Sequence, residues 1–266
     1  MKTVILCGGQ GTRIREANEV LPKPMLPIGG KPIIWHIMKS YASHGVKDFV
    51  LCLGYKGWVI KEFFIHYRAM TTDMTVRLGQ HHDGTEFHGR HDEEDWNVTL
   101  AETGDATMTG GRVSAIRRYV ENDDLFLLTY GDGVSDVDIT RLIAFHRAHG
   151  KVCTVTAVRP PGRFGEMRIV GDLVHDFNEK PQTSEGFING GFFVCDARRI
   201  WDYLGTKREM ILEREPMQRL ASDGELAAFP HTGYWQPMDT LREYNLLNDL
   251  WASGQAPWRS WTNGTR

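Results

Sequence analysis

A glycine-rich turn follows directly on a short apolar run near the start of the chain. The run is Val4–Cys7, the turn is residues 8–13 (GGQGTR), and Lys23 comes ten residues later. Glycines let the backbone bend sharply and bring N–H groups up to an anion, while Arg and Lys supply positive charge. The pattern therefore predicts a strand that ends in a loop for a triphosphate.

The two commoner phosphate loops do not fit this segment. The dinucleotide fingerprint requires a third glycine where Ile14 stands, and the Gly-Lys pair that follows this segment precedes Pro32 instead of Ser or Thr. A tight strand-to-helix turn without a ligand is the plain alternative, because glycine turns are common.

The first half of the chain alternates between apolar runs and helical patterns. We expect strands at 3–7, 49–54 and 125–130. We also expect one helix that starts at Pro32 and a second helix that runs through 61–67. Strands of continuous Val, Ile and Leu between helices indicate an α/β fold with a mostly parallel, Rossmann-like mixed sheet flanked by helices. Ligands in such sheets lie at the carboxyl ends of the strands.

Residues 1–266 are expected to form a single domain, because 266 residues suit one large α/β unit. Residues 70–104 are polar and rich in His and acidic residues, so we interpret them as a lid-like insertion. Residues 151–240 contain shorter apolar runs, which are consistent with a sugar-binding half built on antiparallel and mixed strands. Residues 241–266 are expected to form a C-terminal helix and a Trp-rich tail that packs on the domain or on another subunit.

Composition restricts the class of partner. A net charge of −3 without a dominant basic run argues against nucleic-acid binding. Four widely spaced cysteines indicate reduced, buried thiols, and the sequence contains neither a signal-peptide core nor a stretch long enough to span a bilayer. We therefore expect a cytoplasmic protein that does not bind membranes.

An acidic residue lies where the third predicted strand ends. Asp132 is flanked by two glycines, which give its carboxylate room to face a phosphate-bound Mg²⁺. Gly-Asp-Gly is also compatible with a plain turn. Asp239, in WQPMDT, has the alternative of capping a following helix.

The chain resembles the sugar-phosphate nucleotidyltransferase family over nearly its whole length. The shared motifs are GGxGTR, PKPMLPIGGKPIIWHIMK (22–39), GYKG (54–57), WNVTLAETG (96–104), TGGR (109–112), TYGDG (129–133), PPGRFG (160–165), EKP (179–181), INGGFFV (188–194) and YWQPMDTLRE (234–243). Several of them are specific to the cytidylyltransferase branch, which joins CTP to glucose 1-phosphate and releases CDP-glucose and pyrophosphate.

The resemblance implies a role for each matching residue. Arg13, Lys23 and Asp132 are the expected catalytic residues, and Asp132 and Asp239 are the expected ligands of the cofactor Mg²⁺. The expected nucleotide-binding residues are Leu6, Cys7, Gly8, Gly9, Gln10, Gly11, Thr12, Arg13, Lys23, Thr107, Arg112 and Gly131. The expected sugar-phosphate-binding residues are Gly165, Glu179, Lys180, Asn189 and Gly190.

Several alternatives stay open at this point. A uridylyl- or thymidylyltransferase differs in only a few base contacts, and a non-catalytic regulatory subunit should lack one of the two aspartates or the loop arginine. A zinc site from His81, His82, His88 and His91 matches no standard ligand spacing. Relatives form symmetric oligomers, so we expect a homo-oligomer, and Cys7 suggests sensitivity to thiol reagents.

Overall fold

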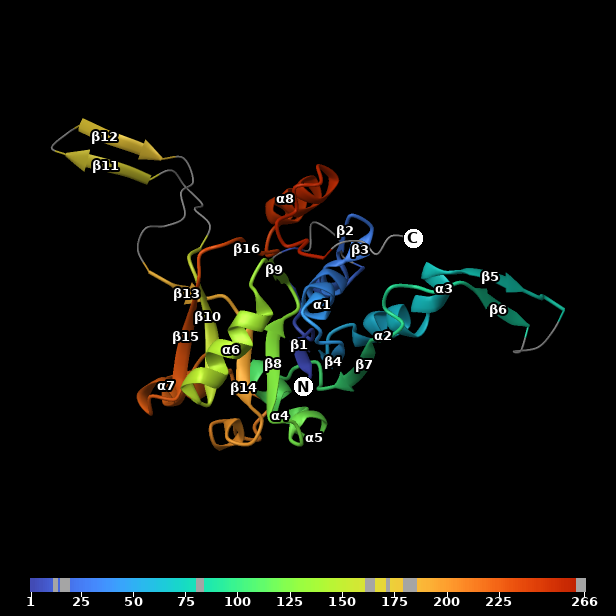
Figure 1. The fold of residues 1–266 in the computed structure, drawn as a ribbon, viewed down its shortest axis with the longest axis horizontal. Helices are drawn as coiled ribbons and strands as arrows, with labels where there is room; N and C mark the ends of the chain where they lie inside the picture. Colours follow the sequence, from blue (N-terminus) through green and yellow to red (C-terminus); the bar gives the residue numbers. More distant parts are fainter. Residues whose placement is uncertain are drawn as a thin grey trace.

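The structure is a computed structural model, and its elements are drawn in Figure 1. It describes residues 1–11, 14, 20–79, 84–160, 166–170, 173–178 and 186–261.

One large mixed sheet forms the centre of the molecule. Its eight strands follow the order β13-β10-β14-β8-β1-β4-β7, with β15 paired to β10. The strands are β1 (Thr3–Leu6), β4 (Asp48–Leu53), β7 (Asn97–Glu102), β8 (Leu125–Tyr130), β10 (Cys153–Val158), β13 (Ile188–Asn189), β14 (Phe193–Asp196) and β15 (Leu226–His231).

Strand β1 lies in the middle of the parallel part of this sheet. It pairs in parallel with β4 on one side and with β8 on the other, so that Leu6 is opposite both Cys52 and Tyr130. The carboxyl ends of the three strands therefore meet at one edge, as expected from the strand predictions. The expected α/β class with a mostly parallel, helix-flanked sheet is confirmed.

Alternating side chains of these strands point to two separate cores. Ile5 of β1 and Leu51 of β4 belong to one core, and their neighbours Val4 and Val50 belong to the other. The first core is covered by α1 (Ile33–Ser43), α6 (Ile139–His149) and α8 (Leu241–Ala252), and the second by α4 (Thr109–Ala115), α5 (Arg117–Val120) and α7 (Glu215–Ser222).

The remaining elements are short. They are η2 (Lys23–Met25), β2 (Pro27–Ile28), β3 (Lys31–Pro32), α2 (Gly57–Ile65), α3 (Tyr67–Thr71), β9 (Gly133–Ser135), η3 (Ile200–Asp202) and β16 (Trp235–Pro237).

Two antiparallel hairpins extend from the main sheet (Figure 1). The first consists of β5 (Asp73–Val76) and β6 (Thr85–His88), and the second of β11 (Glu166–Val170) and β12 (Leu173–Asn178).

The predicted insertion at 70–104 is wrong at its C-terminal end. Residues 97–102 form β7, which pairs in parallel with β4 as part of the main sheet. The prediction missed this strand because NVTLAE is half polar, and β7 lies at the end of the strand order, where such a composition is tolerated. The departure from the strand–helix alternation therefore ends before residue 97.

The C-terminal tryptophans pack onto the domain, one of the two expected arrangements. Trp258 is 1% and Trp261 is 7% exposed, and both surround the ring of His36 on α1. The tail thereby completes the first core.

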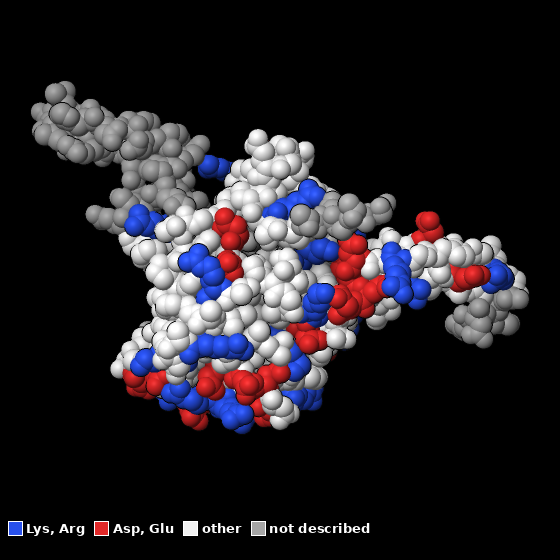
Figure 2. Space-filling view, in the orientation of Figure 1, with Lys and Arg blue, Asp and Glu red and all other residues white. Residues whose placement is uncertain are grey.

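The viewed surface carries mixed charge. In Figure 2, basic and acidic side chains are interspersed and are densest over the lower part of the visible body, in line with the small net charge of −3. Among the described helices, none has the length and apolar character of a membrane span.

Candidate active site

A pocket of about 220 Å³ opens where β1 and β8 end. Residues of the glycine loop and charged side chains from three segments that are distant in the chain line it. The residues that line it are Leu6, Cys7, Gly9, Gly11, Ile14, Lys23, Pro24, Gly131, Asp132 and Asp239. Nine of these ten were singled out by the sequence or lie in its PKP motif, whereas Ile14 was noted only as a departure from the dinucleotide fingerprint.

Lys23 lies between the two aspartates. Its Nζ is 2.6 Å from Oδ2 of Asp132 and 2.6 Å from Oδ1 of Asp239. The three residues are 109 and 216 positions apart in the chain, yet the two carboxylates meet at one cation. Burial by itself would lower the pKa of the Lys23 ammonium, but the neighbouring carboxylates, with Asp132 first, more than compensate and raise this pKa.

A short antiparallel ribbon brings the aspartates together. β16 pairs with β9 so that Pro237 is opposite Gly133, and Met238 N donates a 2.8 Å hydrogen bond to Asp132 O. Asp132 precedes β9 and Asp239 follows β16. The ribbon therefore places both aspartates at the same end.

The start of α8 fixes the backbone of Asp239. Thr240 is the N-cap of the helix and forms a capping box with Glu243. The Glu243 carboxylate also accepts a 2.6 Å hydrogen bond from the Asp239 N–H. The alternative that Asp239 itself is the cap is therefore wrong, and its carboxylate remains directed at Lys23.

The side chain of Arg112 supports the backbone of the glycine loop. The side chain comes from α4, is 4% exposed, and occupies the space that a Cβ at Gly8 or Gly54 would require. Its Nη1 donates to Leu53 O and to Thr103 Oγ1, and its Nη2 donates to Gly8 O and Asp105 O, at 2.7–3.3 Å.

Four of the five N–H donors of Arg112 are therefore bound to protein oxygens. The expected contact of this guanidinium with the nucleotide would use its Nε–H or replace one of these bonds. In the structure, Arg112 acts as a support of the loop.

Close packing explains two further glycines of the loop region. A Cβ on Gly131 would lie 2.9 Å from Leu6 O, so β8 could not approach β1 with a larger residue there. Gly11 has a φ of 57° and lies against the Cβ of Lys23.

The thiol of Cys7 faces inward. It is 1% exposed and donates to Ile5 O at 3.4 Å, and burial raises the pKa of the thiol well above its usual value. The suggested sensitivity of Cys7 to thiol reagents is therefore not supported.

The TGGR segment starts a helix. α4 begins at Thr109, and Gly110 and Gly111 allow close contact with the 208–212 segment. Thr107 precedes the helix and is 4% exposed, beside a second pocket whose lining includes Glu102, Gly104 and Arg208.

The expected sugar-side residues Asn189 and Gly190 lie beside Tyr130 and Trp235. Asn189 Nδ2 donates to the Tyr130 hydroxyl at 3.0 Å, and Tyr130 donates to Glu213 Oε1 at 2.6 Å. Trp235 Nε1 donates to Gly190 O at 2.8 Å.

Tyr130, Glu213 and Trp235 were not among the residues predicted for the site. Tyr130 and Trp235 stand within the matched TYGDG and YWQPMDT motifs, which was an available signal, but Glu213 has no local signal. Five expected site residues lie outside the described residues, namely Thr12, Arg13, Gly165, Glu179 and Lys180.

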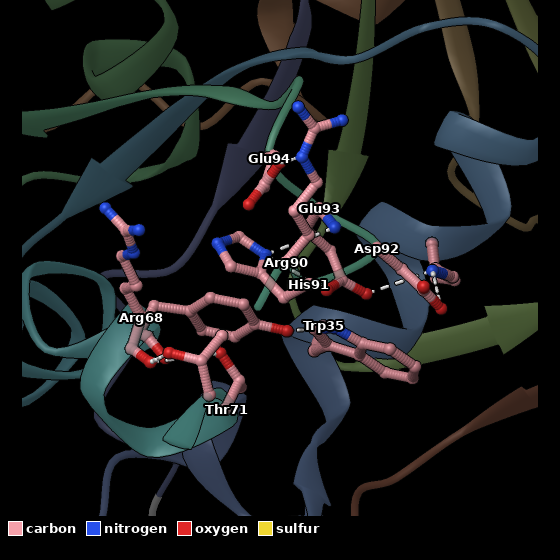
Figure 3. Close-up of polar contacts among 11 residues, drawn as sticks. Trp35, Arg68, Thr71, Arg90, His91, Asp92, Glu93 and Glu94 are labelled. Carbon is pink, nitrogen blue, oxygen red and sulfur yellow. Dashed lines mark hydrogen bonds and ion pairs between the residues drawn. The ribbon is translucent and has the colours of Figure 1, made fainter. Parts of the chain in front are cut away.

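Asp92 and Glu93, which Figure 3 shows near Trp35, belong to a second lysine–carboxylate cluster. Lys39 on α1 binds Glu93 at 2.9 Å, with Asp92 at 3.7 Å. The Lys39 ammonium also lies over the rings of Trp35 and Trp96, 5.5 and 5.9 Å from their centroids.

The described histidines of the proposed zinc site make other contacts. His91 packs its ring against Tyr67 and accepts from Glu93 N, and His88 bonds to Thr75. Among the described residues, no three His, Cys, Asp or Glu side chains are grouped to hold a metal ion. His81 and His82 lie outside the described residues.

Comparison with known proteins identifies the family. The model of the family described as nucleotidyl transferase matches residues 2–248. A glucose-1-phosphate cytidylyltransferase of Salmonella typhi is 52% identical over 98% of this chain and 100% of its own length. A mannose-1-phosphate guanyltransferase of Schizosaccharomyces pombe is 28% identical over 92% of this chain and 62% of its own length.

The fold is also found among solved structures. HddC of Yersinia pseudotuberculosis, in complex with GMP-PN, has a TM-score of 0.67 and 20% identity over 94% of this chain and 99% of its own. The match to the family model and the 52% identity show that this chain is an enzyme of the nucleotidyl transferase family, in the glucose-1-phosphate cytidylyltransferase branch.

Proposed function

We propose that the enzyme transfers a cytidylyl group from CTP to α-D-glucose 1-phosphate and releases CDP-glucose and pyrophosphate. The observation that carries this proposal is the convergence of Asp132 and Asp239 on one cation beside the glycine loop. The 52% identity to the Salmonella typhi enzyme supports the choice of nucleotide and sugar.

The reaction requires charge neutralisation more than proton transfer. A phosphate oxygen of the sugar phosphate attacks the α-phosphorus, and pyrophosphate leaves on the opposite side. This nucleophile is already an anion at neutral pH, so the site has to bring anions together and stabilise the charge on the leaving oxygens. Lys23 and the loop N–H groups suit this role, and we propose that Arg13 assists them.

The donor set fits a hard divalent cation. Two carboxylates from separate segments already meet within 2.6 Å of one ammonium nitrogen, and Mg²⁺ prefers carboxylate and phosphate oxygens. We propose that Asp132 and Asp239 hold Mg²⁺, which when bound supplies Lewis-acid neutralisation of phosphate oxygens.

The sugar phosphate is proposed to lie on the β8–β14 side of the pocket. Asn189 and Gly190 are held there by Tyr130 and Trp235, which support the positions of an amide and an open backbone. We propose that Gly165, Glu179 and Lys180 complete this side.

We propose that the enzyme is a homo-oligomer, in which residues 70–96 cover the site or contact a neighbouring subunit. An isolated two-stranded hairpin is only marginally stable in water. Large apolar side chains of this region are exposed, among them Met70 at 60%, Val76 at 48% and Leu78 at 94%. A neighbouring subunit would remove this surface from water.

Four free, buried cysteines support the proposal of a reducing, cytoplasmic setting.

The choice of base is the point at which the proposal is easiest to test. A uridylyl- or thymidylyltransferase would use the same phosphate chemistry, and the guanyltransferase relative illustrates that the family is not restricted to one base. We expect kcat/KM with CTP to exceed that with UTP and dTTP when glucose 1-phosphate is the acceptor. Equal or higher values with UTP or dTTP would replace the proposed nucleotide, and a lack of product with all three would favour the regulatory subunit.

A further inference from the structure

The position of Lys23 points to a second role for this residue. Its ammonium lies at the place where the two carboxylates meet, and its side chain is 10% exposed. A metal ion shared by Asp132 and Asp239 and the Lys23 ammonium would therefore compete for the same oxygen atoms.

Charge balance makes this competition consequential. With Lys23 in place, the three side chains carry a net charge of minus one, which attracts a divalent cation weakly. Without the ammonium, two adjacent carboxylates would carry minus two, matched to a divalent ion. Like charges so close are costly unless a cation compensates them. Lys23 is thus a resident counter-ion.

The backbone keeps Lys23 in reach of both the aspartates and the glycine loop. The residue begins η2 between Pro22 and Pro24, which restrict the backbone, and its Cβ packs against Gly11. Its four-carbon stem leaves the ammonium free to turn between the carboxylates and an anion bound at the loop.

We propose that Lys23 excludes divalent cations from the aspartate pair until a nucleoside triphosphate arrives and draws its ammonium toward the phosphates. The metal then enters together with the nucleotide instead of before it. This inference rests on the proposed function of the same site. It adds an order of binding and a reason for a lysine at position 23.

Metal binding to the full chain without nucleotide tests the inference. Free Mn²⁺ is titrated into the protein and followed by electron paramagnetic resonance, which needs no turnover. We expect Lys23→Met to bind one Mn²⁺ at least about tenfold more tightly than the wild type, because a neighbouring positive charge is removed. Lys23→Arg keeps the charge and should bind as weakly as the wild type.

Lys39→Met is the matched control, because Lys39 is also held by two carboxylates but lies outside the pocket. It should not change the affinity for Mn²⁺, and the added change Asp132→Asn should abolish the gain in Lys23→Met. If Lys23→Met does not fold, Lys23→Gln serves the same comparison.

A folded Lys23 variant that binds Mn²⁺ no more tightly than the wild type would overturn the inference. The proposed reaction would be untouched by that result, since it is tested separately by the products that the wild type forms.

Discussion

Two lysines of this protein are each held by two carboxylates, and only one of the pairs belongs to the candidate site. Lys23 and Lys39 are similarly buried, with side chains 10% and 14% exposed. The Lys23 ammonium faces a pocket between the glycine loop and β8. The Lys39 ammonium lies over the rings of Trp35 and Trp96.

The difference shows that an ion pair alone does not mark an active site. The Lys23 group converges with loop N–H groups and with aspartates from two segments at the carboxyl edge of a parallel sheet. The Lys39 group ties α1 to the segment before β7, so its charges serve the packing. Substitutions in the Lys23 group should therefore lower turnover more than stability, and substitutions in the Lys39 group should lower stability more than turnover.

The largest effect is expected for Asp132→Asn. The amide keeps the shape but removes the charge that pairs with Lys23 and is proposed to bind the metal, so kcat should fall by a factor on the order of a thousand or more. Steady-state rates with CTP and glucose 1-phosphate measure this loss, and thermal unfolding should show that the fold remains. Asp136→Asn, outside the pocket, is the control and should retain most activity; normal kcat in Asp132→Asn would remove this residue from the site.

A smaller effect is expected for Arg112→Lys, which tests the support of the loop. Lysine keeps the charge but cannot make the four hydrogen bonds that hold Gly8, Leu53, Thr103 and Asp105, so kcat/KM for CTP should fall by about ten- to a hundredfold.

A residue that supports the loop affects the binding of every nucleotide equally, so the loss of kcat/KM should be equal for CTP and UTP. A loss confined to CTP would instead indicate direct contact between Arg112 and the base. The surface change Arg117→Lys on α5 controls for the substitution itself.

Lys39→Met should change turnover by less than about twofold and act on stability instead. Glu93, with 8% of its side chain exposed, loses its close cation, and we expect the free energy of unfolding to fall by about 1–3 kcal/mol. Denaturant unfolding measures this change. Lys47→Met, which breaks an exposed pair with Asp95, should have a much smaller effect; if Lys39→Met lowered kcat as strongly as Asp132→Asn, the contrast between the two groups would be lost.

The smallest effect on activity at neutral pH is expected for His36, three residues before Lys39 on α1. Its Nε2–H donates to Ile28 O and its Nδ1 accepts from Trp258, which requires a neutral ring. Burial lowers the pKa of His36 to about 4, from 6.5 in the unfolded chain.

Between these two values the unfolded chain binds a proton that the folded chain excludes, so stability falls as the pH falls from 6.5 to 4. The share of His36 amounts to about 3 kcal/mol. In His36→Gln the unfolding free energy should depend less on pH across this window, while the exposed His66→Gln should follow the wild type. An unchanged pH profile in His36→Gln would contradict the assignment.

The sequence predicted the parts of the fold that local patterns encode. Continuous apolar runs predicted β1, β4 and β8, and the glycine turn with Asp132 located the edge of the sheet where the pocket lies. β7 was missed because edge strands tolerate polar residues.

Other features depend on contacts between residues far apart in the chain, which no local sequence pattern predicts. The brace by Arg112 joins segments 104 residues apart, and the approach of Asp239 to Lys23 depends on the β9–β16 ribbon. Glu213 reaches Tyr130 from 83 residues away. Resemblance to a family can propose such residues, but their geometry follows from tertiary packing.

The central claim is that Asp132 and Asp239 share one divalent cation with a bound triphosphate. A crystal structure with Mn²⁺ and a non-hydrolysable CTP analogue, with the anomalous signal of manganese recorded, tests it most directly. We predict an anomalous peak in contact with both carboxylates, with the Lys23 ammonium moved from between them to the phosphates. A nucleotide-bound peak away from these two aspartates, with Lys23 still bridging them, would contradict the claim.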